Sequence, residues 1–231
     1  MRDALALALA SVVGVVPSAV PEDACAVEDV SITWGFKESF RSYISSSIAN
    51  GSWEVSGDVG YEIPEFTFTG SSGFLAPDRS KGQVGFTGGI VFSGHDGILE
   101  TSLQNPELVV TGPREATLVL DVTGDTMEEV SVNQQNVDFA SVTWDGSWET
   151  VDADQGVWRV VDAEVTLTQV GSEAFGTYPA GEVLDPMSFT LSLTPGCLED
   201  DGPSIWWIPG GAVAIAAGLS ALALAIRRGR K

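Results

Sequence analysis

Short apolar runs, separated by glycine, proline, asparagine and aspartate, occupy most of the chain between its two cysteines. Within these runs β-branched and aromatic residues alternate with polar ones, which is typical of strands with one buried face. Six runs show the pattern most clearly: Tyr61–Thr69, Gln83–Ser93, Leu108–Thr111, Thr117–Val122, Val157–Leu167 and Ser188–Leu193. No βαβ alternation and no phosphate-binding glycine motif occurs, which argues against a nucleotide-binding α/β fold. We therefore predict a mainly β domain, antiparallel and sandwich-like.

One segment has the spacing of a helix instead. Its apolar positions recur every three or four residues, the period of a buried helical face, at Phe36, Phe40, Tyr43, Ile44 and Ile48. We predict one short α-helix over Lys37–Ile48 that packs against the sheet. Ser39 precedes Tyr43 by four residues and shares its face, whereas Arg41 points roughly the other way. From spacing alone, Tyr43 is expected to be a core tyrosine with a satisfied hydroxyl.

The start of the chain has the pattern of an export signal. Arg2 precedes a stretch rich in alanine, leucine and valine that ends at the small residues Ser18 and Ala19. We predict a signal peptide over residues 1–19, with an extent to residue 24 or an uncleaved N-terminal anchor as the alternatives.

The end of the chain has the pattern of a membrane anchor. Residues 205–226 carry no charge, and as a helix they would extend about 33 Å, roughly the thickness of a bilayer core. The basic tail at 227–231 marks the cytoplasmic side, and Trp206 and Trp207 suit the outer interface. We expect a single-pass protein inserted in the cell membrane, with an extracellular domain over residues 25–197 and a short linker at 198–204.

The cysteines and the charge agree with export. Cys25 and Cys197, the only two cysteines, lie just outside the ends of the folded region, so the simplest interpretation is one disulfide that encloses the domain. Of the 32 acidic residues only Asp3 lies outside residues 22–203, compared with five of the 11 basic ones, which leaves this region a net charge near −25. Such a surface repels phosphates, so we expect no nucleic-acid partner.

Few residues are available for catalysis. His95 is the only histidine, in the turn-like sequence Gly94-His95-Asp96-Gly97, which excludes a metal site with several histidines. From the residues alone, His95 is expected to be an exposed hairpin residue. No Gly-x-Ser-x-Gly nucleophile elbow occurs. A glycosidase with a carboxylate pair stays open, because so many acidic residues make any chosen pair uninformative.

Three segments carry a further signal: Trp34–Ile44, Val91–Gly97, and Tyr178–Gly181 leading to Leu184-Asp185-Pro186. The first is a dense run of matching residues, and the order and separation of the three also fit. Together they resemble the HtaA-type haem-binding domain of actinobacterial surface proteins, in a single-domain, membrane-anchored form. The resemblance extends over about Cys25–Cys197.

The resemblance implies a haem site. Tyr43 would ligate the haem iron through its phenolate oxygen, His95 would hydrogen-bond that oxygen, and Ser39, Phe40 and Tyr178 would help to line the pocket. A free tyrosine has a pKa near 10, but ferric iron is a hard Lewis acid and favours the phenolate. The expected ligand is haem b in its ferric form, as transported cargo. The implied function is capture of haem at the cell surface and transfer to other surface haem receptors and a membrane haem importer, without catalysis.

Two further expectations concern the walls of this site. Phe36, Phe40, Phe92 and Phe175 are candidates for apolar contact with the porphyrin and equally good candidates for the core, and Lys37 or Arg41 is a candidate for the propionates, with exposure to water as the alternative. Two alternative functions stay open: a structural or adhesive β-sandwich surface protein that binds no haem, and a carbohydrate-active surface enzyme.

Overall fold

Thirteen antiparallel strands make up most of residues 20–70, 72–125 and 131–200, the part of the chain that this computed structural model describes. The strands are β1 (Cys25–Trp34), β2 (Ser52–Gly57), β3 (Val59–Glu62), β4 (Glu65–Gly70), β5 (Gly73–Leu75), β6 (Gly82–Gly85), β7 (Gly88–Gly94), β8 (Leu99–Gly112), β9 (Glu115–Asp125), β10 (Ser131–Thr143), β11 (Glu149–Asp152), β12 (Val157–Leu167) and β13 (Met187–Leu193). The prediction of a mainly β, antiparallel domain is confirmed.

The strand pairings form a closed circuit. β1 pairs with β5 on one side and with β13 on the other. From β5 the circuit continues through β6, β8, β9, β10 and β12 to β13. β7 and β2 extend the sheet from β8, β4 and β3 extend it from β1, and β11 pairs with β12. All the strands are therefore joined in one hydrogen-bonded sheet.

Alternating side chains of these strands fill the interior. Along β13 every second residue is buried, from Met187 to Leu193, as the period of a strand requires. Trp34, Trp158, Phe66 and Phe189 are among the largest side chains that are almost completely buried. Removing this apolar surface from water supplies most of the stability of the fold.

Two predicted runs are each divided into two strands. Tyr61–Thr69 is interrupted by a turn at Ile63–Pro64, between β3 and β4. Gln83–Ser93 is interrupted between β6 and β7, which pair with different halves of the long strand β8. On its other side β8 pairs with β9, and the register of that pairing shifts between Gln104 and Glu107, where Pro106 has no N–H to donate. The apolar pattern continues through both interruptions, which is why the sequence showed single runs.

The helices differ from the prediction in number and length. α1 spans Glu38–Ile44 and is shorter than predicted, and a second helix, α2, spans Gln169–Phe175. Because α1 ends at Ile44, Ile48 is 72% exposed, and its assignment to the buried face is wrong. α2 begins where the Thr168 hydroxyl accepts a hydrogen bond from Gly171 N at 2.8 Å and ends at Gly176, which is left-handed.

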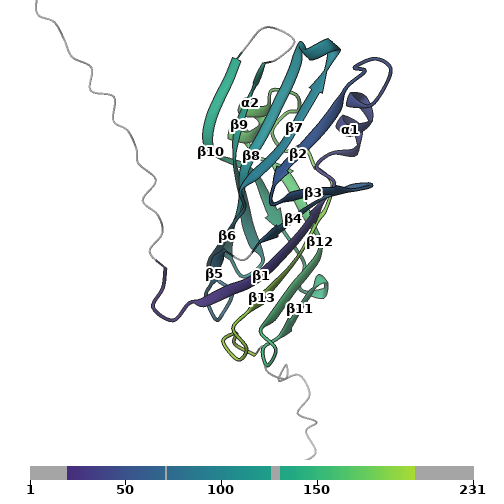
Figure 1. Cartoon of the computed structure of the whole chain (residues 1–231). Coiled ribbons are helices and arrows are strands. Elements are labelled where there is room, and N and C mark those ends of the chain that lie inside the picture. Colours follow the sequence, from purple (N-terminus) through teal and green to yellow (C-terminus); the bar gives the residue numbers. More distant parts are fainter. Residues whose placement is uncertain (1–19, 71, 126–130, 201–231) are drawn as a thin grey trace, which may run out of the picture.

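The molecule has two distinct ends (Figure 1). α1 and α2 lie at one end, and the chain enters and leaves the domain at the other. Cys25 and Cys197 are disulfide-bonded there, as predicted. We call these the helical end and the disulfide end.

The predicted membrane segments lie elsewhere in the chain. Neither helix within the described ranges is long and apolar enough to span a bilayer. The predicted signal peptide at 1–19, the transmembrane helix at 205–226, the tail at 227–231 and residues 201–204 of the linker lie outside the described residues.

Candidate functional site

Helix α1 is held on a cluster of five phenylalanines. Phe36, just before the helix, packs against four others with ring centroids 5.3 to 6.3 Å apart. We call Phe36, Phe40, Phe92, Phe139 and Phe175 the aromatic cluster; all five are buried. It joins α1 to β7, β10 and α2. With Phe40 and Ile44 turned inward, Ser39 and Tyr43 remain on the accessible side of α1.

Tyr43 and His95 form a hydrogen-bonded pair. Tyr43 Oη lies 2.5 Å from His95 Nε2, and the two ring centroids are 5.9 Å apart with the planes at 45°. Tyr43 comes from the last turn of α1, whereas His95 begins the 3-10 turn His95–Gly97 between β7 and β8. Both residues are only partly buried. The structure thus brings together two groups that are 52 residues apart in the sequence.

The turn that carries His95 has an unusual backbone. His95 and Asp96 are left-handed, with φ of 54° and 55°, which is uncommon for residues other than glycine. His95 N donates to the carbonyl of the buried Ala49 at 2.6 Å, and Ile98 N donates to the His95 carbonyl at 3.2 Å. The segment after α1 therefore holds this turn beside the helix.

A second pair continues along the same helix face. Ser39 Oγ and Tyr178 Oη are 3.0 Å apart. Tyr178 follows α2, where its ring stacks on Phe175 at 6.0 Å and its carbonyl accepts a hydrogen bond from Ser172 Oγ at 2.7 Å. Ser39 and Tyr43 lie one turn apart on α1, so the two hydrogen-bonded pairs are neighbours, and we call these four side chains the polar row.

The two predicted propionate contacts are engaged within the chain. Lys37 Nζ lies 2.6 Å from Glu182 Oε1, donates to the Val183 carbonyl and lies 5.6 Å from the centre of the Tyr178 ring. Arg41 is buried, and its Nη2 donates to Asp185 Oδ2 at 3.0 Å. Both cations thus have acidic partners before any ligand arrives.

The predicted apolar walls lie beneath the polar row rather than beside it. Phe36, Phe40, Phe92 and Phe175 are each at most 4% exposed and belong to the core. Ile48 follows Tyr43 by five residues and Ile98 follows His95 by three, and these apolar side chains are 72% and 60% exposed. Helical spacing predicted a buried position for Ile48, and no pattern in the sequence singled out Ile98.

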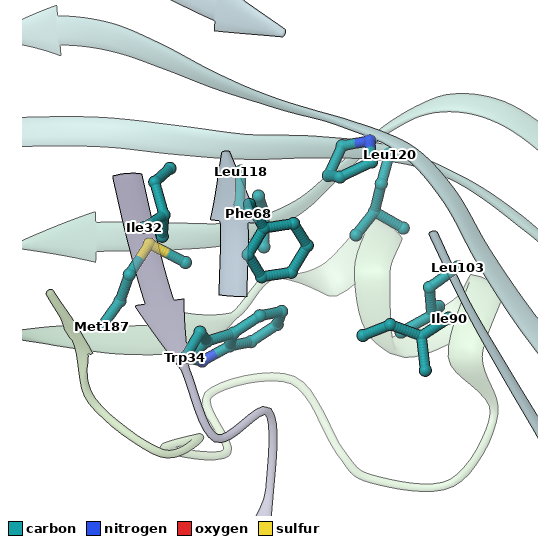
Figure 2. Close-up of a pocket in the computed structure, with 9 residues that line it drawn as sticks. Ile32, Trp34, Phe68, Ile90, Leu103, Leu118, Leu120 and Met187 are labelled. Atoms are coloured by element: carbon teal, nitrogen blue, oxygen red, sulfur yellow. The ribbon is translucent and has the colours of Figure 1, made fainter. Parts of the chain in front are cut away.

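An internal cavity lies apart from this site. Figure 2 shows it in the core, lined by apolar side chains that include Trp34, Phe68 and Leu118. Its volume is about 20 Å³, far below the roughly 300–1,000 Å³ of a pocket that encloses a small-molecule ligand. The polar row, by contrast, lies at the surface of the helical end.

A family model and several solved structures match most of the chain. The family model HtaA, described as "Htaa", matches residues 29–190. The crystal structure of the C-terminal domain of HtaA from Corynebacterium glutamicum is 36% identical, with a TM-score of 0.67, and the match covers 74% of this chain and 99% of that one. The crystal structure of the N-terminal domain of the same protein is 28% identical, with a TM-score of 0.63. This match covers 73% of this chain and 99% of that one.

A third solved structure shares the fold. It is the heme binding protein HtaB from Corynebacterium glutamicum, at 24% identity and a TM-score of 0.60, and the match covers 74% of this chain and 96% of that one. No curated protein matches the chain.

Proposed function

The chain belongs to the HtaA family, and from this premise we propose that it binds ferric haem, with Tyr43 as the axial ligand of the iron. The observation that carries the proposal is the 2.5 Å contact between Tyr43 Oη and His95 Nε2 at the accessible helical end. It gives a phenol oxygen a single, well-placed imidazole partner. A solved relative of the same fold is described as a heme binding protein.

The pair suits a phenolate ligand. Once the Tyr43 proton is lost, His95 Nε2–H can donate to the phenolate oxygen and stabilise its charge. The same bond fixes the direction of the Tyr43 ring and tunes the oxygen as a ligand. Bound haem supplies the ferric iron that favours this anionic form.

The remaining residues of the site fit a large, flat, amphipathic ligand. Ser39 and Tyr178 offer hydroxyl groups on one side of Tyr43. Ile48 and Ile98, which follow Tyr43 and His95 closely in the sequence, add exposed apolar side chains. Because Ser39 is exposed and Tyr43, His95 and Tyr178 are only partly buried, a ligand held by them would leave without rearrangement of the sheet, which suits a protein that passes its ligand on.

The role in the cell follows from the sequence at both ends of the chain. With a signal peptide at 1–19 and a membrane helix at 205–226, the domain would be held outside the cell, close to the bilayer. There it would capture haem and transfer it to other surface receptors and to a membrane importer. A phenolate ligand stabilises ferric over ferrous iron, so reduction would loosen the bound haem.

Titration of the purified full chain with haemin tests the ligand assignment. We expect a saturable Soret band for the parent and its loss in Tyr43→Phe, which keeps the ring and removes the oxygen. Tyr61→Phe is the matched control, because Tyr61 is another partly buried tyrosine, packed against Trp53 and Phe66 away from the polar row. Unchanged affinity and spectrum in Tyr43→Phe would show that the assignment is wrong.

His95 is tested by the rate of haem release. Loss of a group that hydrogen-bonds a metal ligand weakens metal binding by about 10- to 100-fold, so we expect His95→Ala to bind more weakly and to release haemin faster to apomyoglobin. Equal release rates for His95→Ala and the parent would remove the proposed role of His95.

A further inference from the structure

Asp185 contacts helix α1 and the segment that leads into it from the connection between α2 and β13. We propose that Asp185 is a positioning residue for the haem ligand: it fixes α1 so that Tyr43 meets His95. The inference rests on the proposed function for its consequence on haem, but the contacts themselves are independent of any ligand.

The first contacts are with the turn between β1 and α1. Asp185 N donates to the Phe36 carbonyl at 2.9 Å, and the Asp185 carbonyl accepts from Trp34 Nε1 at 2.9 Å. The carboxylate lies directly against Gly35, where an added Cβ would come within 2.3 Å of Asp185 Oδ2. Phe36 adopts φ of 64°, unfavourable for a bulky residue, so this turn depends on the contacts around it.

The second contacts are with α1 itself. Asp185 Oδ1 accepts a hydrogen bond from the backbone N–H of Glu38, the first helical residue, at 3.0 Å. The residue at the usual capping position, Lys37, provides no side-chain cap. Asp185 therefore supplies, from 147 residues away, the contact that a capping side chain normally makes. A helix of seven residues is unstable alone and depends on such tertiary contacts.

The third contact is with Arg41. Asp185 Oδ2 accepts from Arg41 Nη2 at 3.0 Å, and both side chains are largely shielded, with 10% and 22% of their surface exposed. Arg41 Nε is buried and has no hydrogen-bond partner within the described residues. The carboxylate of Asp185 therefore balances much of the buried positive charge of Arg41. Without Asp185 the guanidinium would be drawn toward water. Because Arg41 lies two residues before Tyr43 on a short helix, this movement would shift Tyr43 relative to His95.

The opposite end of the molecule offers a matched control. Glu149 is also a shielded carboxylate with an indole donor, Trp158 Nε1 at 2.8 Å, and with arginine partners, Arg79 Nε at 3.5 Å and Arg114 Nε at 3.6 Å. Its loss should destabilise the fold without reaching α1. A difference between Asp185→Ala and Glu149→Gln therefore separates positioning from general stability.

Two measurements on the full chain test the inference. In the absence of haemin, hydrogen exchange of the amides of residues 38–44 should become at least about tenfold faster in Asp185→Ala and stay unchanged in Glu149→Gln. With haemin bound, release to apomyoglobin should accelerate about tenfold in Asp185→Ala, with a smaller fraction showing the spectrum of tyrosinate-ligated ferric haem. Glu149→Gln should keep the parental release rate and spectrum.

The outcomes distinguish failure of the positioning role of Asp185 from failure of the proposed haem binding. Parental exchange of residues 38–44 in Asp185→Ala overturns the positioning role, whether or not haemin binds. Faster exchange with a parental release rate and spectrum also overturns it. If the parent binds no haemin while exchange responds as expected, the proposed function fails and the hold of Asp185 on α1 is supported.

A second variant covers the case in which Asp185→Ala does not fold. Arg41→Met/Asp185→Ala removes both charges and leaves no unpaired guanidinium, but it still lacks the contact to Glu38 N. We expect faster exchange at the start of α1 in this variant, and parental exchange there overturns the inference.

Discussion

The helical end and the disulfide end are each organised around one carboxylate, but with different results. Asp185 joins the connection before β13 to a short helix, and Glu149 on β11 joins Trp158 to two arginines. At the helical end the neighbouring side chains form two hydrogen-bonded pairs that are partly open to water. At the disulfide end the neighbour is the fully buried ring of Trp158, which packs against Trp144 and Phe189. Similar interactions support partly exposed side chains in one place and a buried ring in the other.

The difference has a physical cause. A binding site needs groups that are fixed in position yet accessible, so its supports must come from behind the surface. Under the proposed function, the aromatic cluster and Asp185 supply that support to the polar row from beneath α1. At the disulfide end the polar groups around Glu149 are directed at one another, so this cluster contributes stability.

Substitution of Phe92 should have the largest effect, both on the stability of the fold and on the rate of haemin release. Its ring packs against Phe36 at 5.3 Å and Phe40 at 5.1 Å, three residues before His95. Phe92→Ala should lower the free energy of unfolding by about 3–5 kcal/mol and accelerate haemin release. Phe189→Ala, in the buried aromatic group with Trp144 and Trp158, should cost similar stability without changing release. Denaturant titration and haemin transfer measure the two effects, and equal release rates would erase the distinction between the ends.

Removal of the disulfide comes next. The bond closes a loop with a sequence separation of 172 residues, and Cys25→Ser/Cys197→Ser should lower the free energy of unfolding by about 2–5 kcal/mol. The haemin spectrum of the folded fraction should stay parental, because the polar row lies at the other end. Reduction of the parent should reproduce the loss measured by denaturant titration. An altered spectrum in the folded variant would show that the two ends are coupled.

Glu149→Gln should have a moderate effect. The amide keeps an acceptor for Trp158 Nε1 but no longer carries the charge that faces Arg79 and Arg114, and we expect a loss of about 1–3 kcal/mol in the free energy of unfolding. Haemin affinity should stay within about twofold of the parent, since distant sites contribute independently. A larger change in affinity would mean that stability at the disulfide end is transmitted to the polar row.

Acid should act weakly, through carboxylates in turns: Asp78, Asp145 and, between β2 and β3, Asp58, whose pKa is lowered by hydrogen bonds from Thr87. Hydrogen bonds from the hydroxyl and N–H of Ser80 lower the pKa of Asp78 below its usual 3.8, and the N–H of Ser147 lowers the pKa of Asp145 in the same way. A carboxylate with a depressed pKa stabilises the fold above pH 3.8, and this stabilisation is lost as the pH falls through its folded-state pKa. Asp145→Asn should therefore slightly reduce the loss in the free energy of unfolding as the pH falls below 3.8, measured by denaturant titration at several pH values. The exposed Asp154→Asn is the control, and an equal response of both variants would contradict this cause.

Local patterns predicted a good part of the molecule. Strand periodicity identified the β runs, and helical spacing identified α1 through Phe36, Phe40 and Ile44. The two cysteines predicted the disulfide. The amino-acid sequences of three short segments predicted the HtaA family, and the comparisons confirm it. Each of these signals lies in a short stretch of sequence.

What the sequence did not show depends on long-range contacts or on short elements. The role of Asp185 arises from partners 144 to 151 residues away, which no periodicity records. α2 is only seven residues long, and its signals were the flanking Thr168 and Gly176. Lys37 and Arg41 were assigned to a ligand because the acidic partners Glu182 and Asp185 come from a distant segment.

The Cys25–Cys197 bond also decides how the domain responds to mechanical force. The two cysteines stand where the chain enters and leaves the sheet, so tension between the two chain ends passes through the covalent bridge. The strands between them, and with them α1 and the turn of His95, stay outside the path of the force. Stretching the chain by its ends would therefore leave Tyr43 and His95 in contact for as long as the bridge is intact.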